Sequence, residues 1–313
     1  MPATSTALIL HHYDASPFSH KARMLLGLKD AQWLSVQTPN MMPKPDLVPL
    51  TGGYRRAPVM QIGADVYCDS QLIMAEIDRR LPSTASDAGN AWMVNHWADR
   101  AMFEPTVAII FGGLGEKVDP AFIADREKLT GRPFDIAAMA KAALPAQAQW
   151  RAMAGWIEEA LEASGAGYLN GTEPGIADLA AFMNIWFLAN TFPDLAQALT
   201  GGFEKLARWR RDMEAIGEGE RTEISGSDAL QIAADSQPGE TSMTHADASC
   251  PGLAPGDPVI AMATDYGRDP VRGTLVATDA QRMVIARMDD ALGALHLHFP
   301  RVGYILVPDE RRQ

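Results

Sequence analysis

The chain has 313 residues, enough for two or three domains, and its 47% hydrophobic and 21% charged residues are the balance of an ordinary globular protein. A formal net charge of −12 argues against non-specific binding to nucleic acids or to anionic membranes. The chain has two cysteines without CxxC spacing, which predicts no disulfide framework. It has no apolar stretch of ~20 residues, which predicts no membrane span. Because no signal-peptide pattern stands at the start, we expect a cytoplasmic location.

Residues 1–84 alternate strand and helix signals, which predicts a mixed sheet flanked by helices. A short apolar run at 7–11 is typical of a buried strand, and a serine-proline pair followed by apolar residues at helical spacing predicts a helix over 16–28. After a proline-rich loop, residues 57–68 alternate as a hairpin. An Asp-Ser pair then begins another helix that ends near residue 81.

Residues 85–235 lack clear strand signals and form the second predicted domain, a helical bundle. Its long helical patterns run over residues 90–111, 146–163, 176–188 and 203–216. The third of these is apolar nearly all round, so we expect it to be buried on most faces.

The last part of the chain has a different character again. Composition is typical of a linker from residue 217 to 255, with one short helix beginning near Ser225, so we end the helical domain at 235 and assign 236–255 as the linker. Short apolar runs separated by turns then predict a small β-barrel-like extension over 256–313. The expected strands are 259–263, 271–277, 282–287, 294–299 and 304–307.

The helix start that follows the first strand is the place where chemistry is expected. A thiol reacts as its thiolate, and its ordinary pKa is about 8.5. The free N–H groups and the dipole of a helix N-terminus stabilise such an anion. By spacing alone, Ser16 is equally well explained as the cap of that helix.

The string SPFSHKAR, which contains Ser16 and Ser19, resembles the active-site start of glutathione transferases. The resemblance implies that the Ser16 hydroxyl donates a hydrogen bond to the sulfur of glutathione and lowers the pKa of the thiol. Tyr13, at the end of the strand, is the alternative donor. Cysteine-bearing members of the family carry their nucleophilic cysteine at the position of Ser16. Two serines therefore disfavour a glutaredoxin-like reductase that works through an enzyme thiol.

The segment APVMQIGADVYCDSQLIMAEIDRRLP resembles the family's cis-proline, hairpin and acidic-Ser segment. The resemblance implies that Pro58 is cis and that the backbone of Ala57 pairs with the cysteinyl part of glutathione. It also implies that Asp69 and Ser70 take the γ-glutamyl end, although both residues also suit plain capping of the helix that follows.

The resemblance to the family covers residues 5–216 in all, about two thirds of the chain. In YLNGTEPGIADLAAF, Asp178 resembles the residue that caps a buried helix of the second domain, with Gly175 where the family usually has Ser or Thr. The tail resembles a β-rich tail of some bacterial transferase-like proteins. His296 and His298 share one strand face there, and we interpret them as packing residues without a metal.

These features predict an α/β plus all-α protein: a thioredoxin-like N-terminal domain, a helical-bundle second domain and the β-rich extension. The predicted function is a glutathione S-transferase that uses glutathione as co-substrate, attacks a small hydrophobic electrophile, forms a homodimer and needs no metal. The alternative is a non-catalytic glutathione-binding or protein-interaction module that uses the extension. Three basic residues are candidates for the glycyl carboxylate: Lys44, Arg55 and Arg56. Candidates for the electrophile pocket are Tyr13, Met102, Phe103, Phe111 and Trp186.

Overall fold

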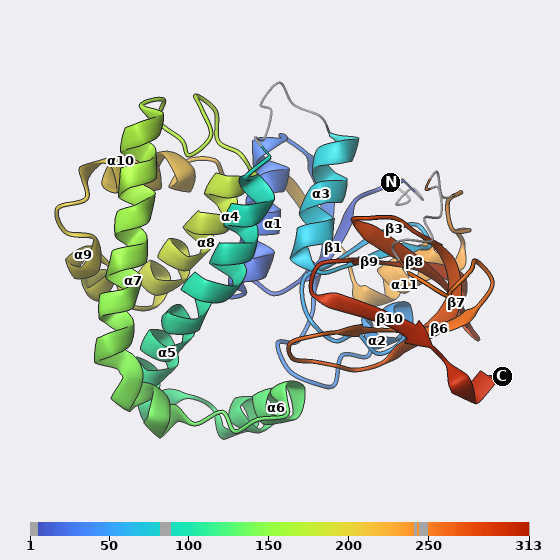
Figure 1. Cartoon of the computed structure of the whole chain (residues 1–313). Coiled ribbons are helices and arrows are strands. Elements are labelled where there is room, and N and C mark those ends of the chain that lie inside the picture. The colour runs from blue at the N-terminus through green and yellow to red at the C-terminus, as the bar shows by residue number, and fades with distance from the viewer. Residues whose placement is uncertain (1–5, 82–88, 241–242, 244–249, 313) are drawn as a thin grey trace.

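The computed structural model describes residues 6–81, 89–240, 243 and 250–312. The predicted boundary between residues 84 and 85, and parts of the predicted linker, lie outside these residues. Figure 1 shows a helical half and a β-rich half side by side, with α1 and α3 between them.

The first domain has the expected thioredoxin-like order. Its elements are β1 (Ile9–His12), α1 (Pro17–Leu28), β2 (Gln32–Gln37), α2 (Val48–Thr51), β3 (Val59–Ile62), β4 (Asp65–Cys68) and α3 (Ser70–Arg80). Strand β1 is central, pairing in parallel with β2 and antiparallel with β3, and β3 pairs antiparallel with β4. Leu25, Met60 and Ile73 share one core, which joins α1 and α3 to the sheet.

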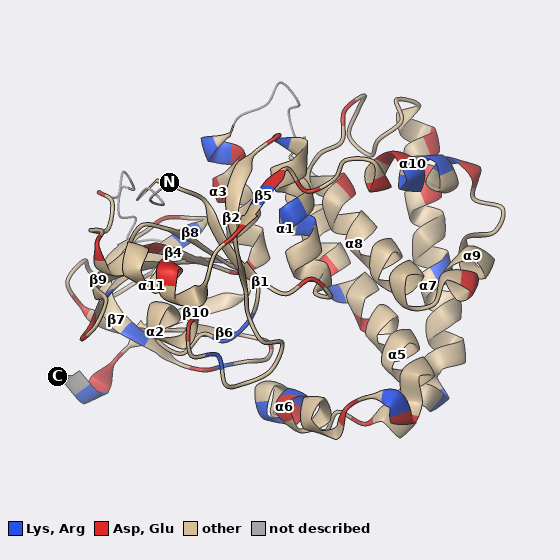
Figure 2. Ribbon diagram, turned by 180° about the vertical axis from the view of Figure 1, so that it is seen from behind, with Lys and Arg blue, Asp and Glu red and all other residues tan. Residues whose placement is uncertain are grey.

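The helical domain is built around α8. Its elements are α4 (Ala91–Trp97), the π-helical turn Ala98–Met102, α5 (Phe103–Leu114), the 3-10 turn Gly115–Lys117, α6 (Pro120–Thr130), α7 (Ile136–Ser164), α8 (Ile176–Thr191), α9 (Pro193–Thr200) and α10 (Glu204–Glu214). Most of α8 is buried, as its apolar composition predicts. In Figure 2, α5 and α8 are almost uncharged, whereas α6 and α10 carry many charged residues.

Asp178 fixes the start of α8 and is fully buried. Its carboxylate accepts hydrogen bonds from the backbone N–H groups of Gly175 and Leu169 and from the Trp209 indole N–H, at 3.1, 2.9 and 2.8 Å. In a capping box, the first residue's side chain accepts from the backbone of the third helical residue, and Gly175 has no side chain to do this. The bond from the Gly175 N–H to the Asp178 carboxylate is the remaining bond of the box, consistent with the structural role expected from the sequence.

Residues 217–235, which the prediction placed in the helical domain despite their linker-like composition, pack instead against the first domain. Strand β5 (Glu220–Glu223) pairs in parallel with β2, and α11 (Gly226–Ala234) contributes Ala229 to a core with Ile9 and Val36 of the first domain. Helix α11 begins with the predicted capping box at Ser225. Strand β5 is an edge strand with the sequence ERTE and mostly exposed side chains, so it gives no apolar signal.

The predicted C-terminal strands are all present. They are β6 (Pro258–Ala263), β7 (Val271–Thr278), β8 (Arg282–Asp289), β9 (Gly293–Pro300) and β10 (Tyr304–Pro308), with a short 3-10 turn after them. They curl round a second core (Figure 1) and continue the first domain's sheet, because β9 pairs in parallel with β4. The order across the 10-stranded sheet is β10-β6-β7-β8-β9-β4-β3-β1-β2-β5.

His296 and His298 lie at this junction. The Nε2 atom of His298 is 2.8 Å from a carboxylate oxygen of Asp65 on β4, and Nδ1 of His296 is 3.8 Å from the same oxygen. Burial lowers the pKa of His298 despite its bond to Asp65. The two histidines therefore help to join β9 to β4, a contact that the sequence pattern did not indicate.

Candidate functional site

Ser16 caps α1 and faces a cavity. Its Oγ atom accepts a hydrogen bond from the Ser19 N–H at 3.1 Å, so it is a genuine helix cap. Among the described residues, no acceptor contacts the proton of the Ser16 hydroxyl, which is free to donate to a ligand. Ser16 itself is only 1% exposed, so such a ligand atom must sit directly against the helix start.

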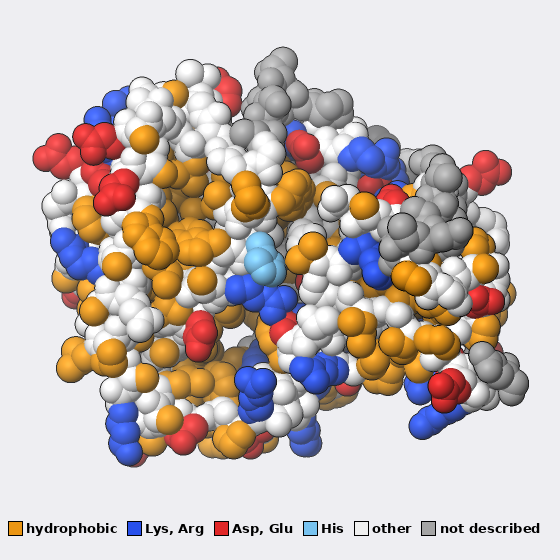
Figure 3. Space-filling view, in the orientation of Figure 1, with side chains coloured by type: hydrophobic (Ala, Val, Ile, Leu, Met, Phe, Trp, Pro, Cys, Tyr) orange, Lys and Arg blue, Asp and Glu red, His pale blue; other side chains and the backbone are white. Residues whose placement is uncertain are grey.

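The cavity at Ser16 has a volume of about 520 Å³ and lies between the first domain and the helices. Its walls include Tyr13 beside Ser16, and Phe103 and Phe111 of α5. Figure 3 shows hydrophobic side chains in this hollow and basic side chains on its rim. The expected donors Ser16 and Tyr13 are thus brought together with an apolar chamber.

Two of the residues expected in the electrophile pocket are elsewhere. Met102 is fully buried, and Trp186 stacks on His20 with ring centroids 4.0 Å apart. Their place is taken by Phe122 and Phe134, which form an aromatic cluster with Phe111. Helical spacing identified the apolar residues but not which of them face the cavity.

A smaller cavity, of about 70 Å³, adjoins the first, and Ala57, Pro58, Asp69 and Ser70 all line it. The peptide bond between Ala57 and Pro58 is cis, as expected. Asp69 caps α3 by accepting a hydrogen bond from the N–H of Gln71 at 2.9 Å, and Ser70 is the first residue of that helix. The four residues that the family resemblance implies for glutathione binding therefore line one cavity.

The two cavities share part of their walls. The residues that line both are Phe18, Arg56, Ala57 and Tyr266. A ligand of peptide size can therefore occupy the small cavity with one end and reach Ser16 with another. Tyr266 lies on the loop between β6 and β7, and no sequence signal placed it here.

Basic residues form one end of the larger cavity: Lys44, Arg55, Arg56 and Arg126. The three arginines each pair with an aspartate of the chain. Lys44 is different, because among the described residues no acid lies within ion-pairing distance of its ammonium, and the ring of Tyr13 is 6.0 Å away. Burial, together with the charge of Arg126, lowers the pKa of Lys44 to about 8. Asp125 acts on Lys44 only from beyond ion-pairing distance, and a buried cation without a directly paired acid is a candidate for binding an anion.

The cysteines take no part in this site. Cys68 and Cys250 are both buried and line neither cavity, and burial raises the pKa of the Cys68 thiol well above its ordinary value. Within the described ranges, no cluster of His, Cys, Asp and Glu side chains could hold a metal ion. No helix in the same ranges is both long and apolar enough to cross a membrane.

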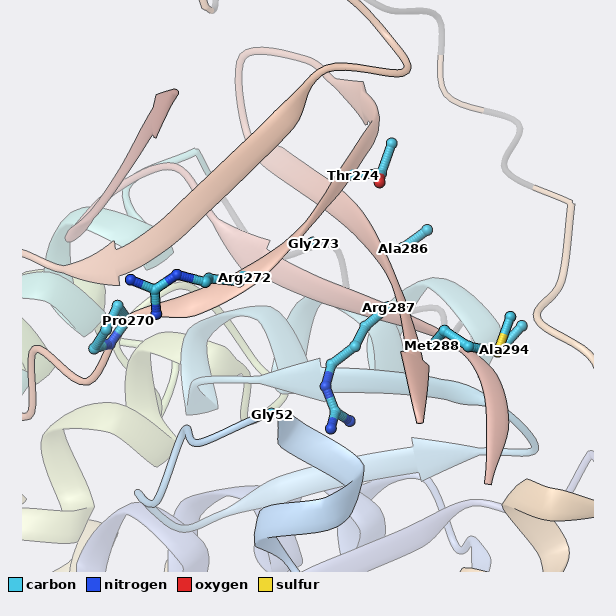
Figure 4. Close-up of a pocket in the computed structure, with 9 residues that line it drawn as sticks. All are labelled: Gly52, Pro270, Arg272, Gly273, Thr274, Ala286, Arg287, Met288 and Ala294. Carbon is cyan, nitrogen blue, oxygen red and sulfur yellow. The ribbon is translucent and has the colours of Figure 1, made fainter. Parts of the chain in front are cut away.

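Another cavity, of about 560 Å³, lies against β7 and β8 (Figure 4). Arg287 points across it towards Gly52, donates to the carbonyl oxygen of Pro49 at 2.6 Å and pairs with Asp289. Arg272 pairs with Asp309 at 3.3 Å. Because these guanidinium groups already have partners, we interpret the cavity as part of the seam between the C-terminal strands and the first domain.

Comparison with known proteins agrees with this geometry. The family model described as glutathione S-transferase, N-terminal domain, matches residues 10–85, and the model for the glutathione S-transferase C-terminal domain matches residues 95–212. A search of curated proteins gave no match.

Solved structures extend the comparison to the whole chain. A GST-like protein from Pseudomonas syringae is 31% identical, with a TM-score of 0.79, and the match covers 97% of this chain and 99% of that one. The Tau class glutathione S-transferase from mango, Mangifera indica, is 18% identical, with a TM-score of 0.51. The match covers 68% of this chain and 90% of the mango chain. Poplar glutathione transferase F1 is 16% identical, with a TM-score of 0.51. The match covers 67% of this chain and 93% of the poplar chain. The plant structures match about two thirds of the chain, whereas the bacterial structure matches almost the full length. The chain therefore belongs to the glutathione S-transferase superfamily.

Proposed function

We propose that the chain is a glutathione transferase that lowers the pKa of the glutathione thiol and directs the thiolate at a small hydrophobic electrophile. The observation that carries this proposal is the start of α1. There the Ser16 hydroxyl proton has no acceptor among the described residues and faces a chamber with aromatic walls. The small cavity next to it contains the four residues expected to hold the rest of glutathione.

Each part of glutathione has a proposed partner. The backbone of Ala57 pairs with the cysteinyl unit, and Asp69 and Ser70 take the ammonium and the carboxylate of the γ-glutamyl unit. Lys44 takes the glycyl carboxylate, because it is a buried cation in the wall of the larger cavity and no acid among the described residues pairs with it. An ion pair of this kind would also raise the lowered pKa of Lys44 towards its ordinary value.

Ser16 then acts on the sulfur. Its hydroxyl and the N-terminus of α1 stabilise the thiolate more than the thiol, so the proton leaves to water. The thiolate forms a C–S bond with the electrophilic atom of the second substrate. In a substitution the leaving group departs with its bonding electron pair, and in an addition the displaced π-electron pair takes up a proton from water. Holding both reactants in adjoining cavities supplies proximity and orientation. Tyr13 is the alternative donor, because its side chain lines the same cavity.

The electrophile is proposed to be flat and largely apolar. Phe111, Phe122 and Phe134 stack or meet edge to face in the wall, with centroids 5.1 to 6.0 Å apart. Aromatic walls of this kind bind aromatic ligands through offset or edge contacts.

We also propose that the protein is a cytoplasmic homodimer. Met93 of α4 and Trp156 of α7 are 68% and 56% exposed, which gives the helical domain apolar surface that a second copy would cover. Light scattering at micromolar concentration would show a dimer, and a monomer would contradict this part of the proposal.

Turnover of a general aromatic electrophile tests the function. We expect glutathione-dependent activity in the wild type, a loss of roughly one to three orders of magnitude in Ser16→Ala, and little loss in Tyr13→Phe. Ser19→Ala is the matched control, because Ser19 lies on the same helical turn but lines neither cavity. A protein that binds glutathione without turnover would instead be a binding module, and a protein that does not bind glutathione would overturn the proposal.

A further inference from the structure

The C-terminal β region, residues 256–312, reaches into the small cavity. Tyr266 on the loop between β6 and β7 lines it, and so does Val302 between β9 and β10. The loop is also held against α6, a wall of the larger cavity, because the Gly267 N–H donates to the carbonyl oxygen of Leu129 at 2.6 Å. The region is thus part of the cavity wall.

Asp265 of the same loop makes two ion pairs in this wall. Its carboxylate is 2.5 Å from the Arg56 guanidinium and also pairs with Arg100. The Arg56 guanidinium lies 4.0 Å above the ring of Tyr266. These contacts fix the β6–β7 loop against two residues that line the small cavity.

A second contact from the region falls directly on Asp69. One carboxylate oxygen of Asp69 accepts the N–H of Gln71, and the other accepts the hydroxyl of Tyr304 at 3.0 Å. Tyr304, on β10, is itself held rigidly. It is 5% exposed, and its ring packs against Phe299 and Tyr54.

An ionised carboxylate offers about four lone-pair sites for hydrogen bonds. Gln71 and Tyr304 each occupy one site, on different oxygens of Asp69, so the carboxylate cannot rotate without losing a bond. The remaining lone pairs of Asp69 are then held in a fixed direction at the small cavity. A fixed acceptor of this kind binds an ammonium group with less loss of conformational entropy than a mobile one.

We propose that Tyr304 is a positioning residue for glutathione binding: it fixes Asp69 for the γ-glutamyl ammonium, so that the C-terminal β region completes the glutathione site. This inference rests on the proposed function. It gives the extension, which lies beyond the two matched family domains, a direct part in substrate recognition.

The test compares two ligands on the full-length chain by calorimetry and steady-state kinetics. One ligand is glutathione, and the other is glutaryl-cysteinylglycine, which lacks only the γ-glutamyl amino group. We expect Tyr304→Phe to weaken glutathione binding about fivefold, to raise KM without changing kcat, and to leave the affinity for the analogue unchanged. In an Asp69→Asn background, Tyr304→Phe should have no further effect.

Tyr67→Phe is the matched control, because Tyr67 is a buried tyrosine of the same sheet whose hydroxyl bonds to Arg80, away from both cavities. A Tyr304→Phe variant that matches this control with glutathione would overturn the inference. Equal losses with both ligands would also overturn it, because they would indicate a general structural effect. A wild type that does not bind glutathione would overturn the proposed function as well.

Discussion

Replacing Lys44 by methionine is expected to raise the free energy of unfolding of the protein and to lower its affinity for glutathione. Lys44 is 5% exposed and has no paired acid among the described residues, and burial lowers its pKa from 10.5 to about 8. A difference of that size corresponds to at most about 3 kcal/mol of destabilisation at neutral pH. Lys44 lines the larger cavity, where water can reach its ammonium and reduce this cost. We therefore expect Lys44→Met to raise the free energy of unfolding by about 1 to 2 kcal/mol.

The pH dependence has a defined sign. The folded-state pKa of Lys44 is below the unfolded value, so the cost is complete below pH 8 and disappears as the pH rises to 10.5. The advantage of Lys44→Met in urea denaturation should therefore shrink over this range. Loss of the proposed ion pair to the glycyl carboxylate should weaken glutathione binding about tenfold to a hundredfold at neutral pH.

Lys29→Met is the matched control. Lys29 is also buried, but its ammonium is 2.5 Å from a carboxylate oxygen of Asp78. This variant should gain no stability and should bind glutathione like the wild type. If Lys44→Met proves less stable than the wild type, or binds glutathione equally well, the argument that Lys44 is an uncompensated cation kept for an anion is wrong.

Other substitutions test the packing and the charges of the fold. A Cβ atom at Gly112 would lie 2.7 Å from the backbone of α7, so Gly112→Ala should lower the free energy of unfolding by about 1 to 3 kcal/mol. Gly155→Ala, whose Cβ would lie 3.5 Å from the nearest ring, should be neutral or stabilising by up to ~1 kcal/mol, and equal melting temperatures for the two variants would contradict the close contact. Asp178→Asn should cost about 2 to 4 kcal/mol in thermal unfolding, because the buried carboxylate accepts three N–H groups; a neutral result would refute its structural role. Burial alone would raise the pKa of Glu218, but hydrogen bonds from a histidine and an arginine of α1 lower it to about 2. Its stabilisation should be complete above about pH 4.5 and fade as the pH falls towards about 2, so Glu218→Gln should flatten acid unfolding over that range.

Local sequence patterns predicted the parts of the fold that depend on neighbouring residues. The serine-proline cap of α1 and the apolar character of α8 are properties of short segments, and the structure has both elements where they were expected. The cis peptide at Pro58 came from the family resemblance alone. The proximity of Ser16, Ala57 and Asp69 followed from that resemblance too, because no local pattern states which loops of a fold meet.

Long-range pairing explains what the sequence did not predict. Strand β5 is polar on both faces, and the register that brings His298 to Asp65 depends on two strands far apart in the chain. The contact of Tyr304 with Asp69 depends on that same continuation of the sheet. The sequence indicated Lys44 only as one basic residue among several, because the pairing of its arginine neighbours with aspartates is a property of the folded chain.

The central proposal is that the chain lowers the pKa of the bound glutathione thiol, and the ultraviolet absorbance of the thiolate during a pH titration measures that pKa directly. We predict that the wild type lowers it by one to two units from the ordinary value of about 8.5, that Ser16→Ala returns it close to that value, and that Ser19→Ala does not. A wild type that binds glutathione while the thiol keeps its ordinary pKa would contradict the proposed activation of the thiol.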